Sequence, residues 1–384
     1  MSDCKLSVII VPCDGDFPPE PCFYSLLSAT DGLEAEIFYA HAGLPQADMR
    51  AHPAGITFVA RPQDAGDTRF VNRLIAQCRG EYVLLLHPDT LVGEDCLRTL
   101  CCFMDEHAEE VGAAGVKMLD VKGVFLPESK RGWPSPRALF CRLYGLARRF
   151  PGSKRYAADD LSALHPDRTH RVDIVSEAFI LINRSVLERT GLLDESFPAA
   201  SAYADLLYRM SAAGYRQYYV PERILHCGSE ASRRGDRIAV CAYYDALSLF
   251  YEKHYPAEKT MSALIRLRRR YALLFEKKKK LRTAKKRRLL VFCRASHLDE
   301  IKDIAKKTLP GVSHVGLWDT GKSRPAEAVA DRRIKMQAYT DIAFCLPDIS
   351  CAQILLFIDR MTEKSTVYHI YLSETKQFVS CETA

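Results

Sequence analysis

The stretch YVLLLHPDT at residues 82–90 decides the fold, because an apolar strand runs directly into a polar turn that contains a carboxylate. Tyr82–Leu86 has the continuous apolar pattern of a buried strand, and Pro88 ends it. In open α/β sheets, ligands bind just beyond the carboxyl ends of strands, which is where Asp89 falls. The pattern leaves two readings of Asp89 open: a metal or phosphate-side ligand, or the N-cap of a helix that starts near Val92.

On both sides of this strand, short apolar runs alternate with segments of helical spacing over the first 256 residues. Strands are predicted at 5–11, 36–40, 56–60 and 81–86, with a strand region at 172–183 and extended pieces at 218–220 and 224–226. Helices are predicted at 22–29, 70–78, 185–190, 205–213 and 238–254. Such alternation predicts a mostly parallel sheet with helices on both faces.

After residue 256 the pattern changes twice. Residues 257–288 are predicted to form a basic helical linker, since 266–288 holds thirteen Lys or Arg and a single acid in a chain whose net charge is only +6. A second α/β pattern then occupies 289–384. Its strands are predicted at 289–293, 315–318, 341–346 and 367–371, and its helices at 298–308 and 351–361. We therefore expect three parts, at 1–256, 257–288 and 289–384.

Composition excludes several classes of protein. The 384 residues are 48% hydrophobic and 27% charged, which is typical of globular proteins and excludes disorder, coiled coils and collagen. No apolar run approaches the ~20 residues that span a bilayer, and no signal peptide is visible, so a cytoplasmic protein is expected. The 14 cysteines are scattered without a CxxC pair and are expected to be reduced. Because the basic run lacks interleaved aromatic residues, no nucleic-acid partner is expected.

Several segments, in their order and spacing, resemble the family 2 glycosyltransferases of the GT-A fold. The closest resemblance is to the rhamnosyltransferase-like group that builds bacterial surface polysaccharides. The matching segments are LSVIIV at 6–11, DAG at 64–66 with Asn72, YVLLLHPDT at 82–90, ESKRGWPSP at 128–136, FPGS at 150–153, VDIVSEAFILINRSVL at 172–187, GLLDESF at 191–197 and AGYRQYYVPERILH at 213–226. The resemblance covers about residues 5–256. It implies a GT-A α/β domain, followed here by a smaller accessory α/β domain.

The resemblance also implies a reaction. A nucleotide-sugar donor would bind with its pyrophosphate on a divalent metal, Mn²⁺ or Mg²⁺, and the sugar would pass with inversion to a glycan or lipid-linked acceptor. The metal is expected on Asp89 and His226, and His87 could add an imidazole ligand. Contacts with the nucleotide-sugar are expected from Val11, Asp64, Asn72, His87 and Asp89.

The sequence departs from the family at its working positions. The Glu-Asp pair that supplies the family's base is replaced by Ala202 and Tyr203, while Glu177 replaces a glycine in the loop that borders the acceptor pocket. Glu177 is read either as a relocated catalytic base or as a plug. Two functions follow: an active glycosyltransferase, or an inactive GT-A protein that binds a partner in polysaccharide assembly. Asp205 is expected to hold Arg209 or a backbone amide.

Residues 261–288 have two readings of their own. The apolar residues of 261–275 recur at helical spacing, and the basic clusters at 277–280 and 285–288 follow them. This pattern is typical of a helix that lies on an anionic inner-leaflet surface, where it would suit a lipid-linked acceptor. The alternative is a linker helix that packs on the catalytic domain. Under the first reading the protein is peripheral at the inner face of the cytoplasmic membrane.

Overall fold

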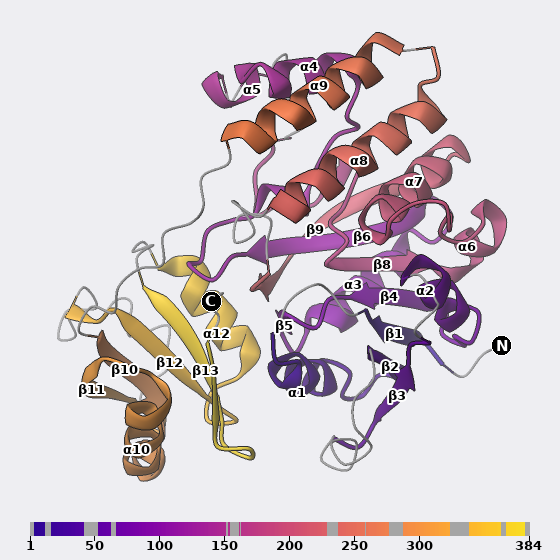
Figure 1. Ribbon diagram of the computed structural model, residues 1–384. Helices are drawn as coiled ribbons and strands as arrows, with labels where there is room; N and C mark the ends of the chain where they lie inside the picture. The colour runs from indigo at the N-terminus through magenta and orange to yellow at the C-terminus, as the bar shows by residue number, and fades with distance from the viewer. Residues whose placement is uncertain are drawn as a thin grey trace.

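Two β-sheets organise the molecule in the computed structural model (Figure 1). The structure describes residues 4–11, 17–41, 53–62, 67–150, 153, 161, 163–228, 237–257, 259–275, 287–322, 338–361 and 366–380. The larger sheet has nine strands in the order β3-β2-β1-β4-β8-β6-β9-β5, with β7 paired to β9. The smaller sheet has five strands and lies beside the β5 end of the larger one.

The larger sheet is built from β1 (Leu6–Ile10), β2 (Ala35–His41), β3 (Ile56–Ala60), β4 (Tyr82–Leu86), β5 (Thr90–Val92), β6 (Val111–Leu119), β7 (His170–Val172), β8 (Phe179–Asn183) and β9 (Arg216–His226). Strands β3, β2, β1 and β4 are parallel, as are β6 and β9. Strand β8 is antiparallel to β4 and β6, and β5 and β7 are antiparallel to β9. The mostly parallel α/β sheet predicted from the sequence is confirmed.

The helices around this sheet are α1 (Glu20–Ala29), α2 (Asp67–Ile75), α3 (Cys96–Glu106), α4 (Pro136–Leu143), α5 (Leu146–Arg149), α6 (Arg184–Thr190), α7 (Ala199–Ala212), α8 (Arg237–His254) and α9 (Lys259–Phe275). Apolar residues of α1 and α3 share one core with one face of the sheet. Those of α2, α6, α7, α8 and α9 share a second core with the other face. Helices therefore cover both faces, as predicted.

Three of the predicted extended segments differ from the structure. The expected pieces at 218–220 and 224–226 are parts of one strand, β9, whose pairing with β6 shifts register between Val220 and Arg223. Pro221 lies in this shift, which is consistent with a proline having no N–H for the ladder. The predicted strand region 172–183 is in fact two strands, β7 and β8, with a loop between them.

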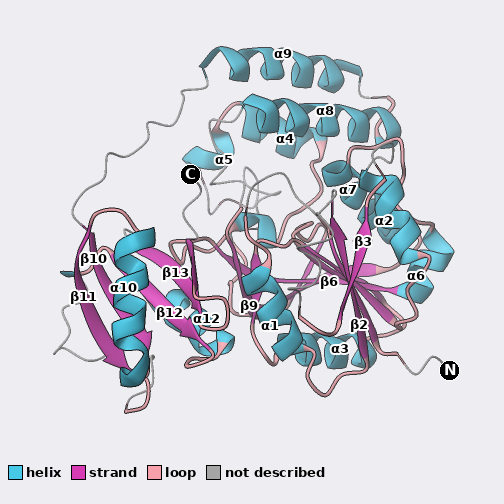
Figure 2. Cartoon of the chain, turned by 60° about the horizontal axis from the view of Figure 1, so that its bottom comes forward, coloured by secondary structure: helices cyan, strands magenta, loops and turns pink. Residues whose placement is uncertain are grey.

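The smaller sheet is doubly wound. It consists of β10 (Arg287–Cys293), β11 (Val312–Asp319), β12 (Asp341–Leu346), β13 (Val367–Leu372) and β14 (Gln377–Ser380), in the order β11-β10-β12-β13-β14. The first four strands in this order are parallel, and β14 is antiparallel to β13. Helix α10 (Leu298–Thr308) packs on one face and α12 (Cys351–Arg360) on the other (Figure 2).

Helix α12 joins the two sheets through a continuous apolar core. Leu91 of β5, Leu225 of β9 and Cys227 just after β9 belong to the same buried cluster as the apolar residues of α12. These three residues are sequence neighbours of Thr90 and His226. The smaller sheet is thus packed directly behind the strand ends that carry the polar turn at 87–89.

Polar contacts fix the same junction. The carboxylate of Glu94 accepts hydrogen bonds from the N–H groups of the first two residues of α12, at 2.6 and 2.7 Å. A carboxylate at this position also interacts favourably with the helix dipole. Nearby, Asp359 of α12 accepts from the ammonium of Lys117 at 2.8 Å and from Nε of Arg223 at 2.6 Å. Lys117 is buried, so this ion pair is shielded from water.

A second buried ion network holds α7 against α8. Asp205 is fully buried and accepts from Nε of Arg209 at 2.8 Å, from Nζ of Lys253 at 2.7 Å and from Nε2 of His254 at 2.8 Å. Arg209 also donates to the carbonyls of residues 190–192 at the end of α6. The prediction that Asp205 holds Arg209 is confirmed. Burial alone would raise the pKa of Asp205, but the hydrogen bonds from Lys253, Arg209 and His254 outweigh burial and lower the pKa.

Candidate functional site

Three side chains that could bind a metal meet at the carboxyl ends of β4 and β9. His87, Asp89 and His226 are all buried, and one ligand atom of each lies within 4.8 Å of the others. Residues 87–89 form the turn between β4 and β5, and Thr90 pairs with His226 across the antiparallel β5–β9 ladder. This register places Asp89 beside the imidazole, with 3.5 Å between Oδ1 of Asp89 and Nε2 of His226.

Backbone hydrogen bonds hold the turn in place. The N–H of His87 donates to the carbonyl of Ala178 at 3.0 Å, and the N–H of Cys227 donates to the carbonyl of Asp89 at 2.9 Å. The hydroxyl of Thr90 donates to the carbonyl of His87 at 2.8 Å. The turn is therefore tied to the start of β8 and to the end of β9, which gives its side chains a fixed direction.

The N-cap reading of Asp89 is wrong. Residues 90–92 form strand β5 rather than the start of a helix, and α3 begins only at Cys96 with Asp95 in the N-cap position. No strand was predicted at 90–92, because three residues between two turns are too short to give a periodic pattern. The ligand reading of Asp89 therefore stays as the open interpretation.

The three residues fit a divalent cation. Oδ1 of Asp89 is buried, and among the described residues no donor makes a hydrogen bond to it. A buried charged oxygen without such a donor is costly, and a cation would remove that cost. Two imidazoles and a carboxylate suit Mn²⁺ or Zn²⁺ as well as Mg²⁺.

Of the other predicted donor-binding residues, the structure describes Val11 and Asn72. Val11 is buried at the end of β1, and its N–H donates to the carbonyl of Leu86 at 2.8 Å, next to the turn. Asn72 on α2 uses its amide to hold the backbone of Leu193, at 2.8 Å and 3.1 Å. Asp64 lies outside the described residues. The donor-binding roles of all three stay predictions.

Glu177 lies in the loop that contacts the turn of the candidate cluster. Its neighbour Ala178 accepts the hydrogen bond from His87, and the Glu177 residue is half-buried. Burial, reinforced by the charge of Glu177, raises the pKa of Tyr203 well above its usual value. Tyr203 therefore stays protonated at neutral pH and cannot act as the base, and Ala202 is fully buried with no group that could.

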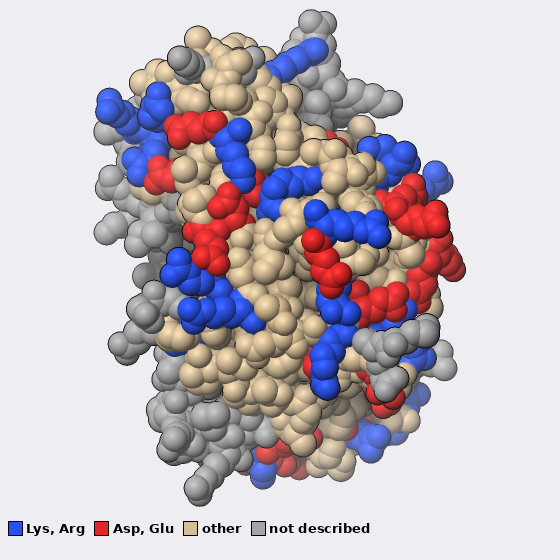
Figure 3. Space-filling model, turned by 90° about the vertical axis from the view of Figure 1, so that its right-hand side faces the viewer, with Lys and Arg blue, Asp and Glu red and all other residues tan. Residues whose placement is uncertain are grey.

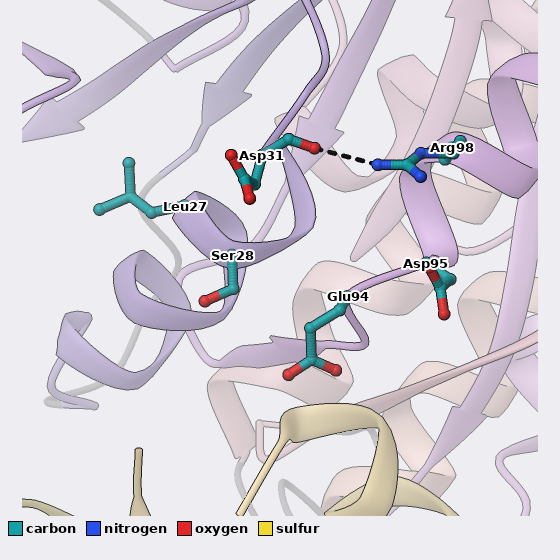
Figure 4. Close-up of a pocket in the computed structure, with 6 residues that line it drawn as sticks. All are labelled: Leu27, Ser28, Asp31, Glu94, Asp95 and Arg98. Atoms are coloured by element: carbon teal, nitrogen blue, oxygen red, sulfur yellow. Dashed lines mark hydrogen bonds between the residues drawn. The ribbon is translucent and has the colours of Figure 1, made fainter.

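A separate hollow of about 560 Å³ opens between α1 and the start of α3 (Figure 4). Its lining residues are Leu27, Ser28, Asp31, Glu94, Asp95 and Arg98. Arg98 donates to the carbonyl of Asp31 at 3.1 Å, and the carboxylate of Glu94 turns toward α12. This hollow contains none of the predicted site residues. No local pattern could have identified Glu94, because its partners in α12 lie 257 and 258 residues away along the chain.

The charges on the face shown in Figure 3 are of both signs. Blue Lys and Arg side chains lie among red Asp and Glu side chains. Ion pairs of this exposed kind include Lys5 with Glu81 at 2.8 Å and Arg216 with Glu110 at 3.2 Å. This face is therefore not a broad surface of one sign, and the concentrated positive charge of the sequence is that of 266–288.

Comparisons with known proteins place the chain in a family. The family model described as "Glycosyltransferase like family 2" matches residues 45–272. A comparison with curated proteins finds no match. Similar solved structures include the mannosyltransferase PcManGT from Pyrobaculum calidifontis in complex with GDP-Man and Mn²⁺, with 18% identity, 70% of this chain and 72% of that chain covered, and a TM-score of 0.43.

Two further structures are similar at a comparable level. TarS from S. aureus has 15% identity and a TM-score of 0.41, with 72% of this chain and 44% of that chain covered. GalNAc-T7 with UDP, GalNAc and Mn²⁺ has 12% identity and a TM-score of 0.42, with 58% of this chain and 44% of that chain covered. At these identities and TM-scores, the classification depends on the family match over 45–272.

Proposed function

Because the chain belongs to glycosyltransferase-like family 2, we propose that it transfers a sugar from a nucleotide-sugar to a cell-surface polysaccharide or lipid-linked glycan, with inversion and with a divalent metal. Family membership confirms the enzyme class and the GT-A fold that the sequence predicted. The rhamnosyltransferase-like subgroup stays a prediction. The observation that best supports the proposal is the buried cluster of His87, Asp89 and His226 at the strand ends.

Each residue of the cluster has a role in this proposal. A bound divalent cation would neutralise the leaving diphosphate as a Lewis acid. His87, Asp89 and His226 would hold it, and the hydrogen bond from His87 to Ala178 keeps the turn oriented. Direct transfer also needs a group that accepts the proton of the acceptor hydroxyl. We assign the role of proton acceptor to the carboxylate of Glu177, since Ala202 has no such group and Tyr203 stays protonated.

Nucleotide binding is the direct test of the proposed function. Titrations of UDP, GDP and dTDP with and without Mn²⁺ should find one nucleotide whose binding requires the metal. Absence of binding by all three would overturn the proposal. That outcome would favour the alternative, an inactive GT-A protein that binds a partner in polysaccharide assembly, to which the loss of the family's Glu-Asp pair at 202–203 points.

Replacement of Glu177 separates a base from a plug. If Glu177 is the base, Glu177→Gln lowers kcat by roughly 10²–10⁴-fold while nucleotide affinity is unchanged, because only proton transfer is lost. Glu177→Gly should give the same loss. The matched control is Glu188→Gln on α6, an exposed acid that should leave kcat as it was. A gain of acceptor binding in Glu177→Gly, with no transfer before or after, would show that Glu177 is a plug.

We also propose that residues 261–288 contact a membrane surface. This proposal depends on the proposed lipid-linked acceptor. No described helix is both long and apolar enough to cross a bilayer. On α9, Met261 and Ile265 are buried in the core that α8 shares, whereas Leu267 is 61% exposed. This packing also supports the linker reading, so any attraction to the surface would come mainly from the basic residues. Co-sedimentation with anionic vesicles should be lost at high salt, and equal binding to neutral vesicles would contradict it.

A further inference from the structure

We propose that the smaller sheet holds a second metal site, one that prefers zinc-type ions, formed by His297, Cys345 and Asp348. One ligand atom of each residue lies within 4.8 Å of the others. The cluster belongs to a different sheet from the candidate site at His87, Asp89 and His226. Its existence does not depend on the proposed transfer reaction.

The topology places these residues where doubly wound sheets bind ligands. The chain leaves β10 for β11 on one side and returns to β12 on the other, and α10 and α12 cover opposite faces. The carboxyl ends of β10 and β12 therefore border the point where the strand order reverses, which is the usual ligand site of such sheets. His297 follows β10, Cys345 is the second-last residue of β12, and Asp348 follows β12.

The cluster has a buried floor and an open side. Cys345 is fully buried, and the side chain of Asp348 is only 3% exposed. The imidazole of His297 is 39% exposed, and its Nδ1 lies 2.6 Å from Oδ2 of Asp348. The N–H of Arg294 donates to the same oxygen at 2.9 Å, which fixes the carboxylate. An ion could therefore enter past His297 and meet ligands that are already held in place.

The chemistry of the donors selects the ion. One thiol, one imidazole and one carboxylate are the ligand types of zinc sites, and a thiolate favours softer ions over Mg²⁺. The cluster at His87, Asp89 and His226 contributes no sulfur. Close by, Cys293 ends β10 and pairs in register with Asp319, which ends β11, so the carboxyl edge of three adjacent strands has residues of ligand type.

Arg294 is one obstacle to a cation. Its Nε lies 3.5 Å from Oδ1 of Asp348, where its positive charge would oppose a metal. The Arg294 side chain is 67% exposed, so it can turn into solvent when an ion binds. The competing interpretation is that Asp348 simply ties the turn after β10 to the turn after β12. A sulfur-specific signal distinguishes a metal site from a purely structural link between the two turns, because such a link would not bring Cys345 to a metal.

Cobalt binding to the full chain tests the proposal. Co²⁺ should give a thiolate-to-metal charge-transfer band that grows with one equivalent of metal, and Zn²⁺ should displace it. Cys345→Ser should lose the band and that equivalent. His297→Gln should weaken the same binding by roughly tenfold or more. Asp89→Ala should keep the band, and so should Cys102→Ser, which removes an exposed thiol from α3.

Two outcomes would overturn the second site. One is a wild-type chain that shows no thiolate band at saturating Co²⁺. The other is a band that persists unchanged in both Cys345→Ser and His297→Gln, since the sulfur would then come from elsewhere. Because Cys345 is buried and its replacement can impair folding, the partly exposed His297 provides the decisive variant in that event.

Discussion

Replacing Asp89 with alanine should abolish Mn²⁺-dependent nucleotide binding, with a loss of affinity of roughly 100-fold or more. Asp89 supplies the only carboxylate of the cluster with His87 and His226, so its loss leaves two imidazoles and no carboxylate to hold a divalent ion. The fold should survive this change. Because Oδ1 of Asp89 is buried without a described hydrogen bond, removing the carboxylate also removes a desolvation cost.

Thermal unfolding measures both effects of this substitution at once. A ligand that binds only the folded protein raises Tm, so Mn²⁺ with the correct nucleotide should raise Tm of the wild-type protein but not of Asp89→Ala. Without metal, the two proteins should unfold at similar temperatures. Asp95→Ala is the matched control, since Asp95 is a nearby exposed acid whose side chain makes no capping bond. A variant Asp89→Ala with unchanged Mn²⁺-dependent affinity would remove the metal assignment.

Replacing Asp205 with asparagine should lower the free energy of unfolding by about 3 kcal/mol. The carboxylate is fully buried among three donors from Arg209, Lys253 and His254. An amide of the same shape removes the negative charge that Arg209 and Lys253 face and leaves Lys253 with Asp194 as its remaining ion-pair partner among the described residues. The N–H groups of the new amide also point at donors. The cost falls at the lower end of the usual range for a broken buried pair, because Arg209 and Lys253 keep 24% and 36% exposure to water.

The difference in unfolding free energy between wild type and Asp205→Asn should depend on pH. The folded-state pKa of Asp205 is lowered, so its contribution to stability is fully present above the unfolded value of ~3.9 and is lost as the pH falls through the folded value. Urea unfolding should therefore separate wild type from Asp205→Asn at pH 7, with the gap shrinking below about pH 4.

The matched control for Asp205→Asn is Asp194→Asn. Asp194 contacts the same ammonium of Lys253 at 2.6 Å but is 31% exposed, so its loss should cost only about 0–1 kcal/mol. Equal costs for the two variants would show that burial of the network does not matter.

The first part of the candidate site could be read from local sequence. Tyr82–Leu86 is an unbroken apolar run that Pro88 ends, and these features suffice to place Asp89 at a strand end. His226 needed the family resemblance, because its position beside Asp89 depends on the pairing of Thr90 with His226 across 136 residues. A register between distant strands has no local signature.

Strand β6 shows a different limit of sequence reading. Its segment VGAAGVKML has small residues with weak strand propensity, and no strand was predicted there. The structure supplies the reason for one of its glycines. A Cβ at Gly115 would lie 2.6 Å from Cβ of Val175, so close packing against that residue requires glycine. Strand β6 therefore owes its place to packing against distant segments, although the intrinsic strand propensity of its small residues is weak.

The enclosure of β5 also bears on self-association. This strand ends the nine-stranded sheet, and an open strand edge is a template on which another polypeptide can pair. Here the N–H of Val92 donates to the hydroxyl of Ser25 on α1 at 3.1 Å, and α12 approaches Gly93 closely, with Ala352 3.6 Å from where a Cβ would be. Two helices from opposite ends of the chain thus shield this edge of the sheet, so cross-β growth and strand exchange between copies are disfavoured beside the turn at 87–89.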